Sequence, residues 1–223
     1  FIFIFYKHYN FMFIQTDRIN IEQIVEELYD FSKPGAIAIK DVLTARGRIA
    51  LYRGVMALKH SFKKAEPKVN NITQDFKYLY IEQVEEQLIN TEFLLSVNQL
   101  KAEYGEIYRK IAQAAQFSSS EFSSLGFNWY KAGSNGISPH RDFETDSDLV
   151  SIFCIDGHAR FCICSDYEKN NSVKLDSTPG NLILLRAARN KDEQKYRPMH
   201  YVETIISEKL TAIFRHETKS VQH

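Results

Sequence analysis

The sequence predicts an α+β fold, a two-sheet jelly roll that carries helices on one outer face. Through much of residues 12–126, apolar residues recur at the spacing of an amphipathic helix. Residues 127–217 instead hold eight short runs rich in β-branched and aromatic residues, and turn residues separate these runs. Strands of this kind after a helical half favour a jelly roll. We therefore expect a single domain over 1–223, with a mainly helical N-terminal part at 12–126 and a jelly-roll core at 127–217.

The N-terminal part is expected to contain helices with clear start and stop signals. Ile21, Ile24 and Leu28 lie at helical spacing, and Pro34-Gly35 ends that helix. Thr44 is a suitable N-cap for the next helix, because its hydroxyl can accept a hydrogen bond from the first turn. The predicted elements are, in order, a helix over 20–31, a strand followed by a turn over 36–43, a helix over 45–63, a polar loop over 70–74 and a mostly helical tract over 81–116.

The second half is expected to consist of strands and turns. Asp156-Gly157, Asn170-Asn171 and Pro179-Gly180 supply residues that tolerate the backbone angles of tight turns. The predicted strands cover residues 127–130, 137–142, 149–155, 160–164, 172–175, 181–185, 199–206 and 209–216.

Composition limits the class of protein. Lys+Arg and Asp+Glu each number 28, so the chain is not coated in basic charge for nucleic acid, although a local basic groove is not excluded. The cysteines, Cys154, Cys162 and Cys164, lack the long-range spacing of a disulfide framework, which favours reduced thiols and a cytoplasmic location. The apolar run at 1–6 is too short to span a membrane, and no membrane segment is expected. Residues 1–11 are interpreted as a leader before Met12, with a short aromatic edge strand as the alternative.

The tripeptide His140-Arg141-Asp142 is the strongest candidate for a metal site. In an extended chain, residues two apart point to the same face, so His140 and Asp142 offer an imidazole and a carboxylate to one point. A second imidazole would complete a 2-His-1-carboxylate triad, which holds Fe(II) and leaves positions open for substrate and O₂. His200 is the favoured third ligand because it begins a late strand that can pair beside the early one, and His158 and His216 are the alternatives.

The last predicted strand carries two cations that could anchor an anionic cofactor. Arg215 has apolar neighbours, so an inward guanidinium there would need a buried anion, and a carboxylate matches it in a bidentate manner. Lys209 precedes it by six residues and therefore lies on the same face of a regular strand. Either side chain could bind a distal carboxylate.

These residues together resemble the Fe(II)/2-oxoglutarate-dependent dioxygenases, whose fold is a double-stranded β-helix of the cupin-like type. The resemblance covers roughly 127–217. It rests on His140-x-Asp142, on the turn and strand entry over 179–185, on His200, and on Arg215 fifteen residues after His200. It implies that the triad holds iron, that 2-oxoglutarate chelates the iron through its C1 carboxylate and ketone, and that Arg215 binds the C5 carboxylate.

A subgroup resemblance adds two expected cofactor contacts. Asn128-x-Tyr130 is similar to the Asn-x-Tyr segment of the AlkB-like proteins, which implies that both side chains contact the oxo acid. The last strand departs from that subgroup, because Lys209 and Arg215 stand where two arginines are usual and Thr211 stands where an Asn is usual. Demethylation of nucleic acid or protein is therefore the alternative to the main interpretation.

The main interpretation is hydroxylation of a small molecule or an amino-acid-like substrate, with release of succinate and CO₂. A non-catalytic cupin-like binding module is the other alternative. Five side chains near the predicted site are candidate substrate contacts, against the simpler roles of core packing for the aromatics and of a solvated basic loop for the late arginines. They are Trp129, Arg141, Phe143, Arg186 and Arg197.

Overall fold

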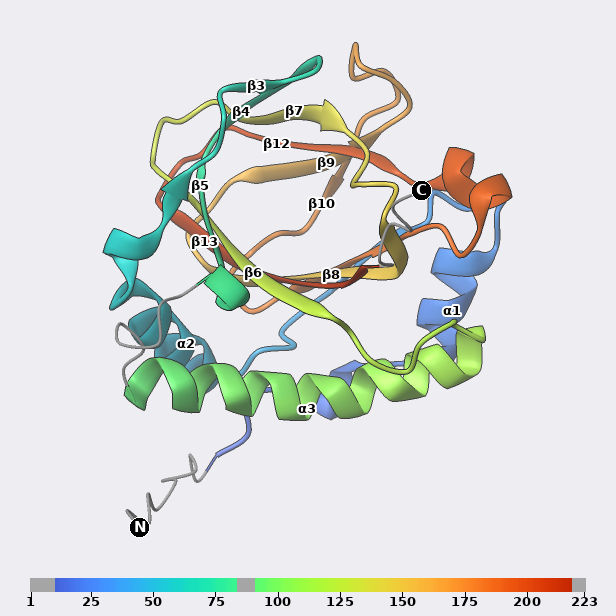
Figure 1. Ribbon diagram of the computed structural model, residues 1–223. Helices are drawn as coiled ribbons and strands as arrows, with labels where there is room; N and C mark the ends of the chain where they lie inside the picture. Colours follow the sequence, from blue (N-terminus) through green and yellow to red (C-terminus); the bar gives the residue numbers. More distant parts are fainter. Residues whose placement is uncertain (1–10, 84–90, 218–223) are drawn as a thin grey trace.

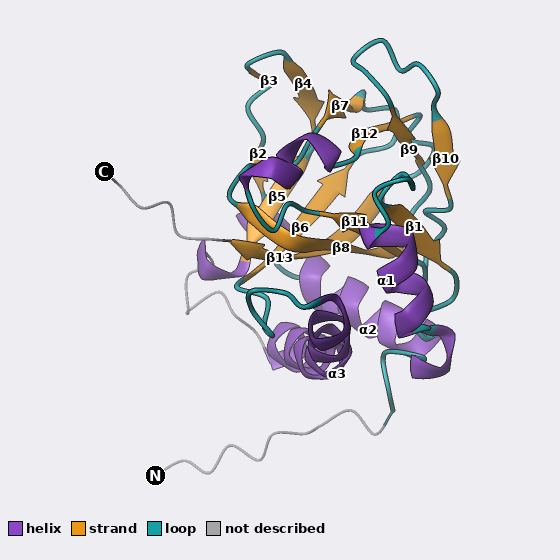
Figure 2. Ribbon diagram, turned by 90° about the vertical axis from the view of Figure 1, so that its right-hand side faces the viewer, coloured by secondary structure: helices purple, strands orange, loops and turns teal. Residues whose placement is uncertain are grey.

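Two antiparallel β-sheets face one another, and the helices cover the outer face of the larger sheet (Figure 1, Figure 2). The structure, a computed structural model, describes residues 11–83 and 91–217. The larger sheet has the strand order β1-β11-β8-β13-β6-β5-β2, and the smaller has the order β10-β9-β12-β7-β4-β3. The predicted fold class, a jelly roll with helices packed on one sheet, is confirmed. The strands are β1 (Ala36–Ile39), β2 (Lys63–Lys64), β3 (Lys68–Val69), β4 (Ile72–Asp75), β5 (Lys77–Tyr80), β6 (Ser124–Tyr130), β7 (Gly136–His140), β8 (Asp146–Asp156), β9 (Arg160–Cys164), β10 (Val173–Leu175), β11 (Leu182–Arg186), β12 (Met199–Glu203) and β13 (Lys209–Glu217).

Local signals in the sequence start the first two helices. The side chain of Asn20 accepts a hydrogen bond from the backbone amide of Gln23, and that of Thr44 accepts one from Gly47, each at 3.0 Å. The predicted cap at Thr44 is thus confirmed. The α-helices are α1 (Ile21–Tyr29), α2 (Ala45–Met56) and α3 (Thr91–Ala115).

Alternation along the central strands divides the interior into two parts. Phe153 of β8 faces the helices, where its ring lies 4.9 Å from that of Tyr104 on α3. Its neighbour Ile152 faces the smaller sheet. The same alternation on β13 turns four side chains into the space between the two sheets: Lys209, Thr211, Ile213 and Arg215.

Strands from the N-terminal part extend both sheets, which the sequence pattern did not predict. β5 pairs with β6 through Tyr78↔Asn128, and β4 pairs with β7 through Gln74↔Ile137. The polar loop predicted over 70–74 is therefore confirmed as a turn at 70–71 and wrong for 72–74, which belong to β4. β3 and β4 form a two-stranded ribbon that turns at Asn70, where φ is +54°. β4 also pairs with β7, which lies far along the chain.

Other boundaries differ because tertiary pairing ends an element early. The helix predicted to reach Lys63 stops at Met56, since Lys63 pairs with β5 in the larger sheet. The tract predicted over 81–116 opens with a 3₁₀ helix, Ile81–Gln83, and continues as α3, while residues 84–90 and positions 1–10 of the predicted leader lie outside the described residues. Within the described ranges, no helix has the length and apolar character needed to cross a membrane.

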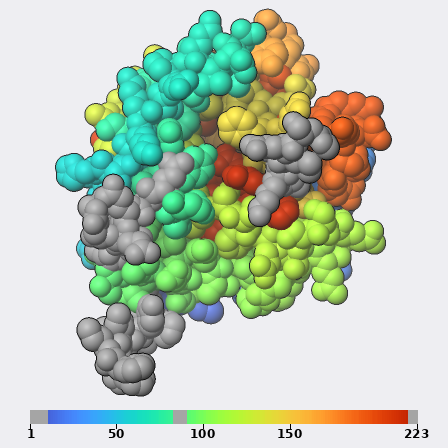
Figure 3. Space-filling view, viewed as in Figure 1, coloured from blue at the N-terminus to red at the C-terminus, as the bar shows by residue number. Residues whose placement is uncertain are grey.

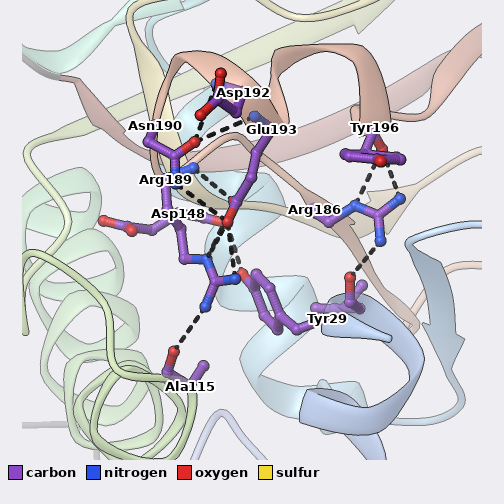
Figure 4. Close-up of polar contacts among 10 residues, drawn as sticks. Tyr29, Ala115, Asp148, Arg186, Arg189, Asn190, Asp192, Glu193 and Tyr196 are labelled. Atoms are coloured by element: carbon purple, nitrogen blue, oxygen red, sulfur yellow. Dashed lines mark hydrogen bonds and ion pairs between the residues drawn. The ribbon is translucent and has the colours of Figure 1, made fainter. Parts of the chain in front are cut away.

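Two arginines tie the segment after β11 to the helices (Figure 4). Arg189 donates to the carbonyl of Ala115 at the end of α3 and pairs with Glu193. The side chain of Arg186 donates from Nη1 to the carbonyl of Leu28 at 2.9 Å and from Nη2 to that of Tyr196 at 2.6 Å. Arg186 is only 5% exposed, so its guanidinium is largely removed from water and depends on these carbonyls for its hydrogen bonds.

Arg186→Ala should lower the free energy of unfolding by about 3 kcal/mol, because two carbonyls lose charged hydrogen bonds. Urea denaturation measures the difference. Arg109→Ala is the control, since it removes only an exposed ion pair with Glu106 and should cost less than about 1 kcal/mol. Equal effects of the two substitutions would contradict the structural role of Arg186.

Candidate metal centre

The pairing of β7 with β12 brings the predicted metal ligands together. His200 lies directly opposite His140 in this pairing, and their ring centroids are 4.3 Å apart. Asp142 follows β7 by two residues, and its Oδ2 lies 3.7 Å from His200 Nε2. Ligand atoms of all three residues lie within 4.8 Å of one another. In the part of the chain that the structure describes, neither His158 nor His216 belongs to a group that could hold a metal ion.

Both imidazole rings are oriented by backbone carbonyls. His140 Nδ1 lies 2.9 Å from the Ser138 carbonyl, and His200 Nδ1 lies 3.3 Å from the Pro198 carbonyl. A carbonyl only accepts hydrogen bonds, so Nδ1 carries the proton in each ring and Nε2 keeps its lone pair for a metal. Two such nitrogens and one carboxylate are the donor set of non-haem Fe(II) sites, so these residues fit that ion.

The electrostatics of the site favour the ligand forms of these groups. Burial, and then the charge of His200, lowers the pKa of His140 to about 4, so this imidazole is neutral at pH 7. Burial alone would raise the pKa of Asp142, but His200, Arg215 and His140 outweigh it and leave that pKa below its ordinary value. His140 and Asp142 can therefore bind a cation at neutral pH without first releasing a proton.

The guanidinium of Arg215 is held between two carboxylates. Its Nη2 lies 3.6 Å from Asp142 Oδ1, and its Nε lies 3.2 Å from Asp146 Oδ2. One oxygen of Asp142 thus faces Arg215 while the other faces His200. Asp146 is 1% exposed, and burial raises its pKa to about 7 despite the opposing effect of Arg215.

Lys209 presents a different arrangement on the same strand. Its side chain is buried, and its Nζ donates to the carbonyl of Ser177 at 2.8 Å. No carboxylate among the described residues lies within ion-pair distance of this ammonium. A buried ammonium without a counter-charge is unfavourable, which makes the position a natural place for an anion.

A cavity of about 340 Å³ lies between the two sheets, with the triad in its wall. In Figure 3 the red atoms of β13 are visible between the teal β2–β5 region and the yellow segment that follows β7. Aromatic side chains stand at the cavity mouth, where the rings of Tyr78 and Tyr80 are 5.5 Å apart and Phe143 is 68% exposed. The remaining lining includes Asn128, Tyr130, Arg141, Cys154, Phe161, Lys209, Thr211 and Arg215.

The predicted substrate residues separate into two groups. Arg141 and Phe143 line the cavity. Trp129 points the other way from its strand, packs against Phe62 at 5.7 Å and belongs to the core, and Arg186 lies between α1 and the segment after β11. Arg197 contacts the triad through the backbone, because its Nη1 donates to the carbonyl oxygen of Asp142.

Sequence reasoning missed the wall that β4 and β5 contribute. Phe76, Tyr78 and Tyr80 all line the cavity, and they alternate along the chain as inward residues of a strand do. That alternation was the available signal. Asp146 offered no such signal, because its contact with Arg215 depends on how the chain turns after the metal ligands.

The sequence matches no family model and no curated protein. Similar solved structures include a prolyl hydroxylase from Trichoplax adhaerens in complex with a hypoxia inducible factor peptide fragment, with a TM-score of 0.62, 13% identity, and coverage of 88% of this chain and 90% of that one. A 2OG-Fe(II) oxygenase family oxidoreductase from Burkholderia pseudomallei has a TM-score of 0.53, 11% identity and coverage of 92% and 94%. A Neurospora crassa protein, solved in complex with alpha-KG and thymine, has a TM-score of 0.54, 15% identity and coverage of 89% and 81%.

At these identities the likeness concerns the fold, and at that level the resemblance noted in the sequence is confirmed. The chain therefore has the fold of the 2-oxoglutarate- and Fe(II)-dependent oxygenases, and His140, Asp142 and His200 form within it the 2-His-1-carboxylate group that suits such iron sites.

Proposed function

We propose that the protein is an Fe(II)- and 2-oxoglutarate-dependent dioxygenase that hydroxylates a small molecule or an amino-acid-like substrate and releases succinate and CO₂. The observation that carries this proposal is the triad in the cavity wall, with two imidazole Nε2 atoms and a carboxylate directed to one point. Iron bound there would supply the activation of O₂, while the protein supplies positioning and charge. The three free thiols support a reducing, cytoplasmic setting.

Arg215 is proposed to orient the carboxylate ligand. Its contact with Asp142 Oδ1 leaves Oδ2 as the oxygen that faces His200 and the metal position. Asp146 in turn fixes the guanidinium from its other side. In metal sites generally, the residues that contact the ligands orient them and affect the affinity for the metal.

Lys209 is proposed to bind the C5 carboxylate of 2-oxoglutarate. The sequence allowed either cation of β13 to do so, with Arg215 as the one implied by the resemblance. The contacts favour Lys209, because the charge of Arg215 already meets two carboxylates whereas no carboxylate of the described chain lies within ion-pair distance of Lys209. Thr211 supports a polar occupant nearby, since its buried Oγ1 lines the cavity and has no hydrogen-bond partner among the described residues.

Asn128 and Tyr130 are proposed to complete the oxo-acid pocket. They lie on β6 opposite Thr211 and Lys209 in the β6–β13 pairing, and both line the cavity. Their amide and hydroxyl groups can hydrogen-bond the carboxylate that Lys209 attracts.

The size of the cavity supports a small substrate. Ligand pockets range from about 300 to 1,000 Å³, and a cavity of about 340 Å³ that must also hold 2-oxoglutarate leaves room for a small molecule or a single side chain. The similar structures bear on both options, because one holds a peptide fragment and another holds thymine.

Release of succinate tests the proposed activity. The purified protein with Fe(II), 2-oxoglutarate and O₂ should form succinate, and a panel of amino acids, nucleobases, peptides and methylated oligonucleotides should contain compounds that raise the rate. Stimulation by methylated oligonucleotides alone would favour demethylation. Iron binding without any turnover of 2-oxoglutarate would favour a non-catalytic binding module.

His140→Ala and His200→Ala should each weaken Fe(II) binding by more than about 100-fold, because each removes one of three ligands. Anaerobic titration with Fe(II) measures the dissociation constant. His158→Ala is the control, since His158 lies in the turn between β8 and β9 and belongs to no metal-binding group in the described chain. Comparable iron affinity in all three variants would reject the assigned ligands.

Lys209→Ala should raise the 2-oxoglutarate concentration at half-maximal turnover roughly 10- to 100-fold, because the distal carboxylate loses a charged hydrogen bond. Lys209→Arg should restore much of the affinity, since it keeps the charge. Arg215→Ala should chiefly weaken Fe(II) binding, because Asp142 loses its orienting partner. A larger effect of Arg215→Ala than of Lys209→Ala on the 2-oxoglutarate requirement would exchange the two roles.

A further inference from the structure

One cation in the cavity wall has no role in holding the metal or 2-oxoglutarate. Lys209 and Arg215 are accounted for by the proposed oxo-acid pocket and by the two aspartates. Arg141 also lines the cavity, yet no carboxylate of the described chain lies within 4.0 Å of its guanidinium. Its charge is therefore available to a bound molecule.

The side chain of Arg141 is held in place without being neutralised. Its Nε donates to the backbone carbonyl of Arg197 at 3.0 Å. A guanidinium has five N–H donors, and this is the one contact of Arg141 within hydrogen-bond distance in the described chain. The fork that binds carboxylates and phosphates is thus fixed in position with most of its donors unused.

Arg197 adds a second positive charge behind the first. It is 9% exposed, and its donors meet only carbonyls, those of Gln194 and Asp142. Arg141 donates to the backbone carbonyl of this same residue, so its guanidinium is anchored to a residue that is itself positively charged.

The rest of the cavity mouth suits an uncharged body attached to such an anion. Tyr78, Tyr80 and Phe143 present aromatic surface at the rim. Acidic side chains near this rim include the exposed Glu66, on the segment between β2 and β3, and Glu82, Asp146 and Glu217, which line an adjoining pocket with Tyr80 and Phe143. An acid with an apolar or planar body would place its body against the rings and its charge against Arg141.

We propose that the substrate is a small-molecule acid whose carboxylate or phosphate binds Arg141 at the cavity mouth, while its body lies against Tyr78, Tyr80 and Phe143. This proposal rests on the proposed function, because it assumes that the metal centre acts on the molecule held in this way. It places Arg141 as a substrate-binding residue and leaves the metal and 2-oxoglutarate contacts unchanged.

Matched probes test the proposal on the full chain with Fe(II) and saturating 2-oxoglutarate under anaerobic conditions. Benzoate, phenyl phosphate and benzamide share a ring and differ in charge, and calorimetry measures the dissociation constant of each. We expect at least one of the two anions to bind roughly tenfold or more tightly than benzamide, because charged hydrogen bonds are stronger than neutral ones. Preference for benzoate would indicate a carboxylic acid substrate, and preference for phenyl phosphate a phosphate ester.

Variants locate the preference at Arg141. Arg141→Gln should abolish it, Arg141→Lys should keep part of it, and Arg109→Gln, which alters an exposed arginine on α3, should not change it. Absence of any preference in the wild-type protein, or a preference that survives Arg141→Gln, would overturn the proposal.

The visible charge-transfer absorption of the Fe(II)–2-oxoglutarate complex separates this failure from failure of the proposed function. If the absorption persists while the anions show no preference, only the Arg141 proposal is wrong. If the absorption never forms, the proposed function itself is wrong. Loss of the absorption on addition of benzoate would mean that benzoate displaces 2-oxoglutarate at Lys209, which also contradicts binding at Arg141.

Discussion

Antiparallel pairing of β7 with β12 is the constraint on which the rest of the site depends. It sets His200 opposite His140, and two further residues of chain bring Asp142 to the same point. Carbonyls two residues before each histidine then orient the rings, so the same two strands supply both the ligands and the groups that direct them. A shift of one residue in this pairing would turn one imidazole to the other face of the sheet and remove the site.

Charge inside the cavity is organised along β13. Alternation places Lys209, Thr211 and Arg215 on one face of a strand whose other face packs against helices. Arg215 at the metal end meets two aspartates, whereas Lys209 further along meets none. We therefore propose different roles for two cations of the same strand: Arg215 orients a metal ligand, and the buried Lys209 binds a carboxylate.

Periodicity and pairing rules predicted much of this arrangement. His200 could be chosen over His158 and His216 because a late strand of a jelly roll returns beside an early one. The ranking of Lys209 and Arg215 could not be predicted, since it depends on Asp146, which reaches Arg215 only after the chain folds back beyond the metal ligands. Asn128 and Tyr130, on either side of Trp129 in β6, were expected to face the cavity. Alternation along the strand therefore places Trp129 on the opposite face, in the core, and not in contact with substrate.

Strands β4 and β5, which lie next to the edges of the two sheets, illustrate the limit of local patterns. Residues 70–74 are mostly polar, so their sequence resembles a loop; 70–71 form a turn, and pairing with β3 and β7 makes 72–74 a strand. These strands form one wall of the cavity, so the aromatic rim follows from the alternation of Phe76, Tyr78 and Tyr80 together with the long-range pairing that brings them beside β6 and β7.

The most direct test of the central claim is the absorption spectrum of the protein with Fe(II) and 2-oxoglutarate in the absence of O₂. If His140, Asp142 and His200 hold iron with positions open to the oxo acid, a visible charge-transfer band should appear on adding 2-oxoglutarate, saturate with it, and be absent in His200→Ala. A protein that binds both components and shows no such band would contradict the account.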